Sequence, residues 1–159
     1  MALTYKHLGG EDLTIFKDLL AVFGEAFGEP ATYGDHVPSD AYLRDLLGKP
    51  HFIALAALAD GAVVGGLCAY VLDKFEQARS EVYIYDLAVA EPHRRKGVAT
   101  GLIRALQPIA RERGAWVIFV QADLVDEPAI RLYESLGTRE DVLHFDIPVV
   151  ERRGRPAVS

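Results

Sequence analysis

A chain of 159 residues has the length of one ordinary domain, and with 50% hydrophobic residues it can bury a full core. Its formal net charge of −6 argues against a nucleic-acid-binding protein, because such proteins normally carry a broad basic face. No apolar run reaches the roughly 18 residues of a membrane span, and the first residues lack the apolar stretch of a signal peptide. We therefore expect a cytoplasmic protein.

The N-terminal part of the chain predicts a short strand followed by two helices. Residues 3–8 fit the strand, and apolar side chains at spacings of three and four then predict an amphipathic helix that ends near Gly28. Residues 29–38 are polar and bounded by prolines, which predicts a loop. Ser39 is a suitable cap for a second helix over residues 39–47.

Two apolar runs follow, residues 52–59 and 63–72, and between them lies an Asp60-Gly61 pair. An Asp-Gly pair between apolar runs is a strong hairpin signal. The next apolar run, residues 82–89, predicts a central strand that breaks at Glu91-Pro92. A basic glycine turn and a helical pattern come after it, and Pro108 inside that pattern is expected to kink or shorten the helix.

The C-terminal part predicts a buried strand over residues 115–120, an acidic loop, and a helix over residues 129–136 opened by Pro128. Residues 140–149 alternate polar and apolar side chains and are interpreted as one strand or a bent pair. The tail, residues 150–159, is polar and expected to be disordered. With no linker or repeat, residues 1–149 are predicted to form a single domain.

The basic turn has the chemistry of an anion site. The first backbone N–H groups of a helix lack partners, glycine allows close approach of a ligand, and the helix dipole favours negative charge. The turn is neither a P-loop nor a dinucleotide fingerprint, because GxxxxGK[ST] and GxGxxG are both absent. Its pattern is Arg94-x-x-Gly97-x-Ala99.

This pattern, between a strand and a helix, resembles the acyl-coenzyme A motif of the GNAT superfamily of N-acetyltransferases. A second element of that superfamily is matched by Ala129-x-x-Leu132-Tyr133-x-x-x-Gly137. The resemblance implies an α/β GNAT fold, with a mixed, mostly antiparallel central sheet of six to seven strands flanked by about four helices. It also implies acetyl-CoA as cosubstrate.

A closer resemblance links the chain to the aminoglycoside 3-N-acetyltransferases of the gentamicin-modifying kind. It spans residues 20–147 and is carried by the runs FIALAA at 52–57, YIYDLAV at 83–89, VQAD at 120–123 and HFDI at 144–147. What it implies is acetyl transfer to the 3-amino group of a deoxystreptamine aminoglycoside, antibiotic resistance, and a homodimer. The alternatives are a GNAT enzyme for another amine, such as a polyamine or a peptide N-terminus, and a non-catalytic acyl-CoA-binding module.

Acetyl transfer to an amine needs a neutral nitrogen, so a carboxylate or a relayed water must accept a proton. Asp86 is the first choice, because it interrupts an apolar strand where an unpaired carboxylate is costly. Pairing with a helix terminus or an arginine is its structural alternative, and Glu81 is the second choice of base. Tyr83 stands where some relatives carry a glutamate base. The resemblance implies Tyr133 as the acid for the departing thiolate.

The resemblance also implies which residues bind the cofactor. The backbone of Leu87, Ala88 and Val89 is expected to pair with the pantetheine arm. The basic turn is expected to bind the pyrophosphate, and the last helix to complete the site. Asp126 stands where relatives often carry asparagine at the start of that helix, and its side chain is expected to keep the helix cap while altering a contact to the cofactor. The predicted cofactor-binding residues of the turn and the helix are Arg94, Arg95, Lys96, Gly97, Val98, Ala99, Thr100, Asp126, Ala129 and Tyr133.

Aminoglycosides are polycations, so their binding site needs carboxylates. The chain supplies them in the predicted loops, although each one alone is also consistent with a solvated surface charge. The candidate substrate-binding residues are Glu29, Asp35, Glu76, Tyr83, Asp86, Asp123, Glu127, His144 and Asp146.

Metal and thiol chemistry are not expected. The histidines show no HxxxH or HExxH spacing, and there is no CxxC pair. The single cysteine, Cys68, lies within an apolar run, which favours core packing over a nucleophilic role.

Overall fold

A computed structural model of the chain describes residues 2–34 and 36–150. The chain divides into two compact units, Met1–Asp123 and Leu124–Ser159, and each is described by itself. Most of the predicted tail, residues 151–159, lies outside the described residues, as does Asp35.

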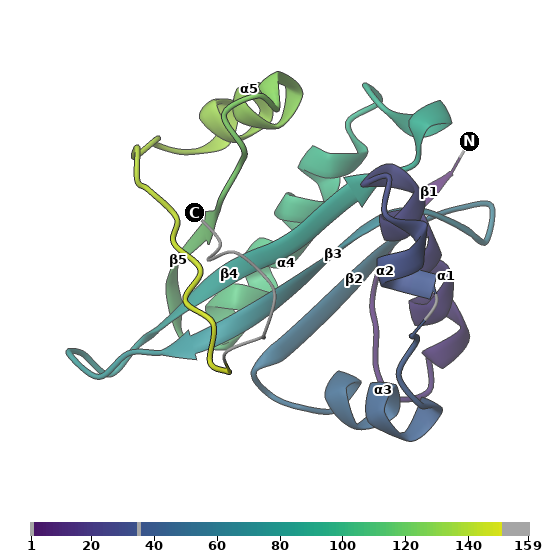
Figure 1. Ribbon diagram of the computed structural model, residues 1–159, viewed down its shortest axis with the longest axis horizontal. Helices are drawn as coiled ribbons and strands as arrows, with labels where there is room; N and C mark the ends of the chain where they lie inside the picture. Colours follow the sequence, from purple (N-terminus) through teal and green to yellow (C-terminus); the bar gives the residue numbers. More distant parts are fainter. Residues whose placement is uncertain (1, 35, 151–159) are drawn as a thin grey trace. The chain divides into compact units, whose positions relative to one another are not determined.

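The first unit is built on a mixed sheet in which the strands follow the chain order (Figure 1). The first four strands pair antiparallel and the fifth pairs parallel to the fourth. The Asp60-Gly61 turn joins the second and third strands, as predicted. The strands are β1 (Leu3–His7), β2 (Phe52–Ala59), β3 (Ala62–Asp73), β4 (Ser80–Val89) and β5 (Ala115–Val120).

The sheet of the described residues has five strands, so the prediction of six to seven was wrong. The difference lies in residues 140–149, where the structure has extended chain without a ladder. A strand needs a neighbour for its backbone hydrogen bonds and a covered face for its apolar side chains. Here Leu143, Phe145 and Ile147 are 84%, 77% and 86% exposed, so the alternating pattern has no packed face.

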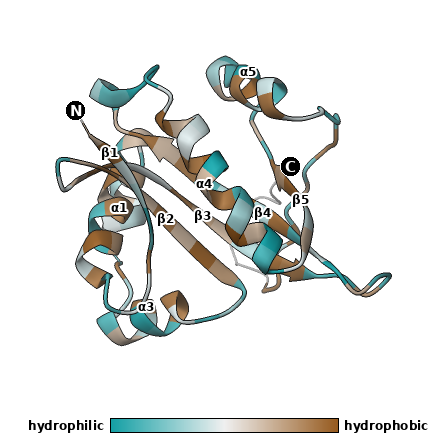
Figure 2. Cartoon of the chain, turned by 180° about the vertical axis from the view of Figure 1, so that it is seen from behind, coloured by the Kyte–Doolittle hydropathy of each residue, from teal (hydrophilic) through white to brown (hydrophobic). Residues whose placement is uncertain are grey.

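Three helices lie on one face of the sheet and α4 (Val98–Glu112) lies on the other (Figures 1 and 2). The three are α1 (Leu13–Ala26), α2 (Pro30–Gly34) and α3 (Asp40–Leu47), and the second unit contains α5 (Glu127–Leu136). A 3₁₀ turn, η1 (Glu91–His93), precedes α4. None of the described helices is long and apolar enough to cross a membrane.

The described residues contain one α-helix more than predicted, because α2 lies in the segment that was predicted to be a loop. Pro30 stands at its first position, where the fixed φ of proline suits a helix and its missing N–H costs no hydrogen bond. The next helix, α3, agrees with the prediction, because the Ser39 side chain accepts a hydrogen bond from Tyr42 N at 3.2 Å.

Pro108 does not cut α4 short, contrary to one of the two expectations for it, since the helix continues through Pro108 to Glu112. Proline removes one backbone donor, which leaves the carbonyl four residues earlier, at Arg104, without its helical partner. Arg104 and Pro108 are both exposed, so water can reach this carbonyl. The apolar side of the helix, with Leu102 and Leu106, stays buried.

The two faces of the sheet bury separate apolar groups. Residues of α1 and α3, among them Phe16 and Leu43, pack with Phe52, Cys68 and Ala88 on one side. Alternate strand residues point to the side covered by α4, and they include Ile53, Leu55, Leu67, Val82 and Ile84. Since both faces are covered, polar side chains on the strands have few open positions, and these define the candidate site.

Candidate active site

A β-bulge in β4 decides which way its central residues point. Cys68 pairs with Asp86 and Ala69 pairs with Ile84, so Tyr85 is the extra residue. Strict alternation would put Asp86 on the same face as Ile84, toward α4. The bulge reverses this, because Asp86 now shares a face with its partner Cys68, on the α1 side.

Tyrosine side chains surround Asp86 on this face. Tyr70 pairs with Tyr83 across the strands, and the Tyr85 ring meets both of their rings edge-on, with centroids 5.8 Å apart in each case. Tyr33 of α2 adds a fourth phenol. We call the group Tyr33, Tyr70, Tyr83, Tyr85 and Asp86 the tyrosine face. Tyr85 is 63% exposed, so the face is open to a ligand.

The carboxylate of Asp86 is half-buried and accepts a hydrogen bond from the Tyr33 hydroxyl, 3.1 Å from Oδ2. Burial raises the pKa of Asp86 above its ordinary value, because the charged form loses solvation. The Tyr33 hydrogen bond acts in the opposite direction, and the nearby charge of Glu29 raises the pKa further. Such a carboxylate has the character of a proton acceptor near neutral pH.

Tyr83 is fixed on its other side by β5. Its ring stacks on Phe119 with centroids 4.7 Å apart and planes 2° apart, and its hydroxyl donates to Gln121 Oε1 at 3.0 Å. Burial raises the pKa of both Tyr70 and Tyr83, so these phenols stay neutral at ordinary pH. They can therefore contact a polar or cationic ligand without adding charge.

Cys68 is buried beside Asp86, its partner across the strands, and the sequence predicted this burial. Burial and the charge of Asp86 together raise the pKa of its thiol, which opposes formation of a thiolate nucleophile. Within residues 2–34 and 36–150, no group of three or more His, Cys, Asp or Glu side chains could hold a metal ion.

The far end of β4 has an open edge. β5 pairs with β4 only between Ser80 and Ile84, so the last part of β4 has no neighbour on that side within the described residues. Ala90 N donates to Val64 O at 2.8 Å, toward β3. By alternation, the backbone groups of Leu87 and Val89 point to the open edge and those of Ala88 point to β3.

The turn after β4, residues 94–100, has the geometry of an anion-binding concavity, and we call it the anion turn. Arg95 and Gly97 have φ of +61° and +78°. Left-handed residues in a turn bring successive N–H groups to one side, and Gly97 is followed directly by the N-terminus of α4. The side chain of Arg94 is tied back by a hydrogen bond from Nε to Val89 O at 2.9 Å.

In the second unit, Asp126 caps α5, because its side chain accepts a hydrogen bond from Ala129 N at 3.2 Å. This agrees with the predicted cap. Tyr133 lies on the same helix and is partly buried. Burial, with a smaller contribution from Asp126, raises the pKa of Tyr133 to about 12, so this phenol keeps its proton at neutral pH.

Of the predicted acidic residues, Glu29 is near enough for its charge to raise the pKa of Asp86, and Glu81 lies elsewhere on β4. Glu81 is five positions before Asp86, which is about 16 Å along a strand. Its carboxylate lies 3.7 Å from Lys74 Nζ, and Glu76 lies 3.5 Å from the same nitrogen. These two carboxylates therefore belong to an ion-pair group at the β3–β4 hairpin.

The other predicted substrate-binding residues are described within their own units. Asp123 is exposed at the end of the first unit. In the second unit, Glu127 pairs with Arg131 at 3.8 Å, and His144 Nε2 lies 2.9 Å from Asp146 Oδ1. Asp35 is outside the described residues.

Tyr33, Tyr70 and Tyr85 are not among the site residues predicted from the sequence. Tyr70 could have been found, because the short polar connection between the strands predicted over residues 63–72 and 82–89 favours an antiparallel pair, in which Tyr70 lies opposite Tyr83. Nothing in the sequence signals the bulge that turns Asp86 toward them, nor the approach of Tyr33 from 53 residues away.

Comparison with known proteins agrees with this geometry. The model of the acetyltransferase (GNAT) family matches residues 17–138. The crystal structure of an aminoglycoside acetyltransferase from an uncultured soil metagenomic sample is 56% identical, with a TM-score of 0.92, and the match covers 94% of this chain and 100% of that one. Another such enzyme from an uncultured soil metagenomic sample, in complex with sisomicin, is 33% identical with a TM-score of 0.86 and coverage of 93% and 97%.

Curated relatives match over a shorter stretch. Streptothricin acetyltransferase of Streptomyces lavendulae is 33% identical over 73 residues, which are 46% of this chain and 39% of the relative. The chain covers 42%, 36% and 39% of the first three curated relatives it matches.

Proposed function

Because the chain belongs to the acetyltransferase (GNAT) family, we propose that it transfers the acetyl group of acetyl-CoA to an amine of an aminoglycoside. The observation that carries this proposal is the half-buried Asp86 carboxylate, set among tyrosines beside the open edge of β4. Similarity to two aminoglycoside acetyltransferases supports the substrate class. The finer proposal, from the sequence resemblance, is the 3-amino group of a gentamicin-like deoxystreptamine aminoglycoside, with antibiotic resistance as the result.

The tyrosine face suits a cationic sugar as the acceptor. Neutral phenol rings attract cations through their faces and stack on the apolar side of a sugar ring. Asp86, with Glu29 beside it, supplies the negative charge that draws an ammonium group to this place. The acceptor amine would thus arrive next to the group that takes its proton.

Asp86 is the proposed general base. It accepts a proton from the acceptor ammonium, and the neutral nitrogen then attacks the thioester carbonyl directly. A C–N bond forms, the C–S bond breaks as the thiolate leaves, and the nitrogen releases its second proton to water as it becomes an amide nitrogen. A positioned base contributes about a hundredfold to ten-thousandfold to such a step. Tyr133 is the proposed acid that returns a proton to the thiolate, and its raised pKa keeps that proton available.

The anion turn is the proposed site for the pyrophosphate of acetyl-CoA. When bound, acetyl-CoA supplies the acetyl group. Backbone N–H groups of the turn and the cationic side chains of Arg95 and Lys96 have the donor chemistry that a pyrophosphate requires. Arg94, whose Nε donates to Val89 O, adds positive charge. The open edge at Leu87 and Val89 is proposed to pair with the pantetheine arm. An N–H at this edge would also stabilise the oxyanion of the tetrahedral intermediate.

The test uses the purified full chain with acetyl-CoA and either sisomicin or gentamicin, and follows thiol release. We expect turnover with both antibiotics, and NMR of the product identifies which nitrogen carries the acetyl group. Spermidine and a peptide with a free N-terminus are the comparison amines. Thiol release with these amines but not with the antibiotics would overturn the substrate class, and acetylation at another nitrogen would overturn only the 3-amino assignment.

A further inference from the structure

The hydroxyl of Tyr33 reaches Asp86 from α2, on a different element from the bulge that presents the carboxylate. We infer that Tyr33 is the positioning residue of the base, which fixes Oδ2 of Asp86 and so turns Oδ1 toward the acceptor amine. The inference rests on the proposed function, because it assumes that Asp86 is the base.

The hydrogen-bonding pattern supports this role. Tyr33 Oη donates to Oδ2 at 3.1 Å, and no hydrogen bond to Oδ1 is seen among the described residues. A carboxylate held at one oxygen has its plane and its direction set, while the other oxygen keeps its lone pairs for a proton. Proton transfer needs such alignment, because the base must lie within hydrogen-bond reach of the amine.

Tyr33 is itself held from one side. Its ring packs against Phe23 and Phe27, with centroids 6.1 Å and 5.8 Å away. Gly24 lets α2 approach α1 closely, because a Cβ there would lie 3.1 Å from Tyr33 Cβ and 3.2 Å from Pro30 Cα.

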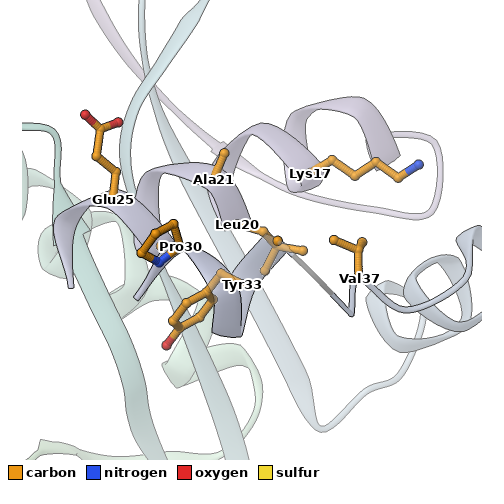
Figure 3. A pocket seen from close by; sticks show the side chains of 9 residues that line it. Lys17, Leu20, Ala21, Glu25, Pro30, Tyr33 and Val37 are labelled. Atoms are coloured by element: carbon orange, nitrogen blue, oxygen red, sulfur yellow. The ribbon is translucent and has the colours of Figure 1, made fainter. Parts of the chain in front are cut away.

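Tyr33 also lines a hollow of about 490 Å³ (Figure 3). Pro30, Leu20 and Val37 line the same hollow, which is mostly apolar. The ring is therefore anchored by α1 and is not enclosed, and its hydroxyl points away from Val37.

The charges around Asp86 show why a neutral donor matters there. From the packed elements, the titratable groups that face it are Tyr33 of α2, Glu29 before α2, Cys68 and Tyr70 of β3, and Tyr83 and Tyr85 of β4. No lysine or arginine forms an ion pair with Asp86 in the described part of the chain. Tyr33 is thus the group that favours the ionised carboxylate, against burial and Glu29.

The direct test is Tyr33→Phe, which removes only the hydroxyl, with Tyr42→Phe on α3 as the matched control. Carbon-13 NMR of labelled aspartate carboxyls follows the titration of Asp86, which is assigned from its absence in Asp86→Asn. We expect Asp86 to titrate at higher pH in Tyr33→Phe and at the original pH in Tyr42→Phe. An unchanged Asp86 titration in a folded Tyr33→Phe protein would overturn the inference.

Kinetics give a second readout with sisomicin and acetyl-CoA. Tyr33→Phe should lower kcat/KM about tenfold near neutral pH, the size expected for one hydrogen bond to a charged group, and should move the acid limb of the pH profile upward. A uniform loss at every pH with the acid limb in place would indicate a structural role and overturn the inference.

A reciprocal measurement does not depend on the folding of Tyr33→Phe. The pKa of Tyr33 is raised by burial and by Asp86, so Asp86→Asn should let Tyr33 ionise at lower pH than in the native protein. The same Tyr33 titration in both proteins would contradict the pairing. Because the NMR measurements need no substrate, they decide the pairing even where no aminoglycoside is acetylated.

Discussion

The anion turn and the tyrosine face lie at the two ends of one strand segment, and they differ in how they are held. The turn is shaped by its own backbone, with Arg95 and Gly97 in the left-handed region directly before α4. The tyrosine face combines side chains from α2, β3 and β4, and Tyr33 and Asp86 are 53 residues apart. A local change can disrupt the first region, whereas the second depends on several distant contacts.

This difference suggests that the anion turn and the tyrosine face bind different substrates. The turn offers main-chain N–H groups, whose chemistry is the same in any sequence with the right backbone, and such a site suits a constant donor such as acetyl-CoA. The tyrosine face offers side chains, which set the shape and charge seen by the acceptor. If this is correct, variants at the two places should affect different kinetic constants.

The largest effect is expected from Asp86→Asn, which keeps the shape of the side chain and removes the base. We expect kcat to fall about a hundredfold to ten-thousandfold while acetyl-CoA binding is retained. In the native protein, kcat/KM should fall as the pH drops through the pKa of Asp86, which gives the pH profile an acid limb. Because burial raises the pKa of Asp86, this acid limb should lie at higher pH than it would for an ordinary carboxyl group. The limb should be missing in the variant. Full activity of Asp86→Asn across pH would shift the base role to a water relay.

A smaller loss of activity is expected from Tyr133→Phe, because the thiolate of coenzyme A can leave before it is fully protonated. We predict a fall in kcat of about a hundredfold, the lower end for a positioned acid, with unchanged acetyl-CoA affinity by calorimetry. Ser135→Ala, on the same helix, is the control, since its hydroxyl donates only to the Leu132 carbonyl. Equal rates for Tyr133→Phe and Ser135→Ala would remove Tyr133 from the chemistry.

The smallest effect, and the one that probes the anion turn, is expected from Gly97→Ala. A Cβ at Gly97 meets no atom within 4 Å, so its cost comes from the φ of +78°, roughly 1 kcal/mol for a residue with a side chain. We expect KM for acetyl-CoA to rise about fivefold, since a factor of ten corresponds to about 1.4 kcal/mol, with kcat and the acid limb unchanged. Gly48→Ala, at an ordinary φ of −85°, is the matched control. A change in the acid limb of Gly97→Ala would contradict the separation of the two regions.

Local signals predicted the elements that local forces control. Ser39 caps α3, Asp60-Gly61 forms the hairpin, and Asp126 caps α5, each through a contact within three residues. Predictions that weighed local propensity alone were wrong, as for the loop expected over residues 29–38, which contains α2. Pro108 is tolerated because it lies on the exposed side of α4, and residues 140–149 form no strand because alternation supplies no ladder partner.

By itself, the sequence determined the anion turn and the strand that leads to it, because a basic glycine turn between a strand and a helix depends on neighbouring residues only. It also supplied the carboxylate of Asp86. The tertiary structure decided where that carboxylate points and what it meets. The bulge depends on the pairing of β3 with β4, and the packing of α2 on α1 brings Tyr33 to Asp86. Neither contact is encoded within one segment of the sequence.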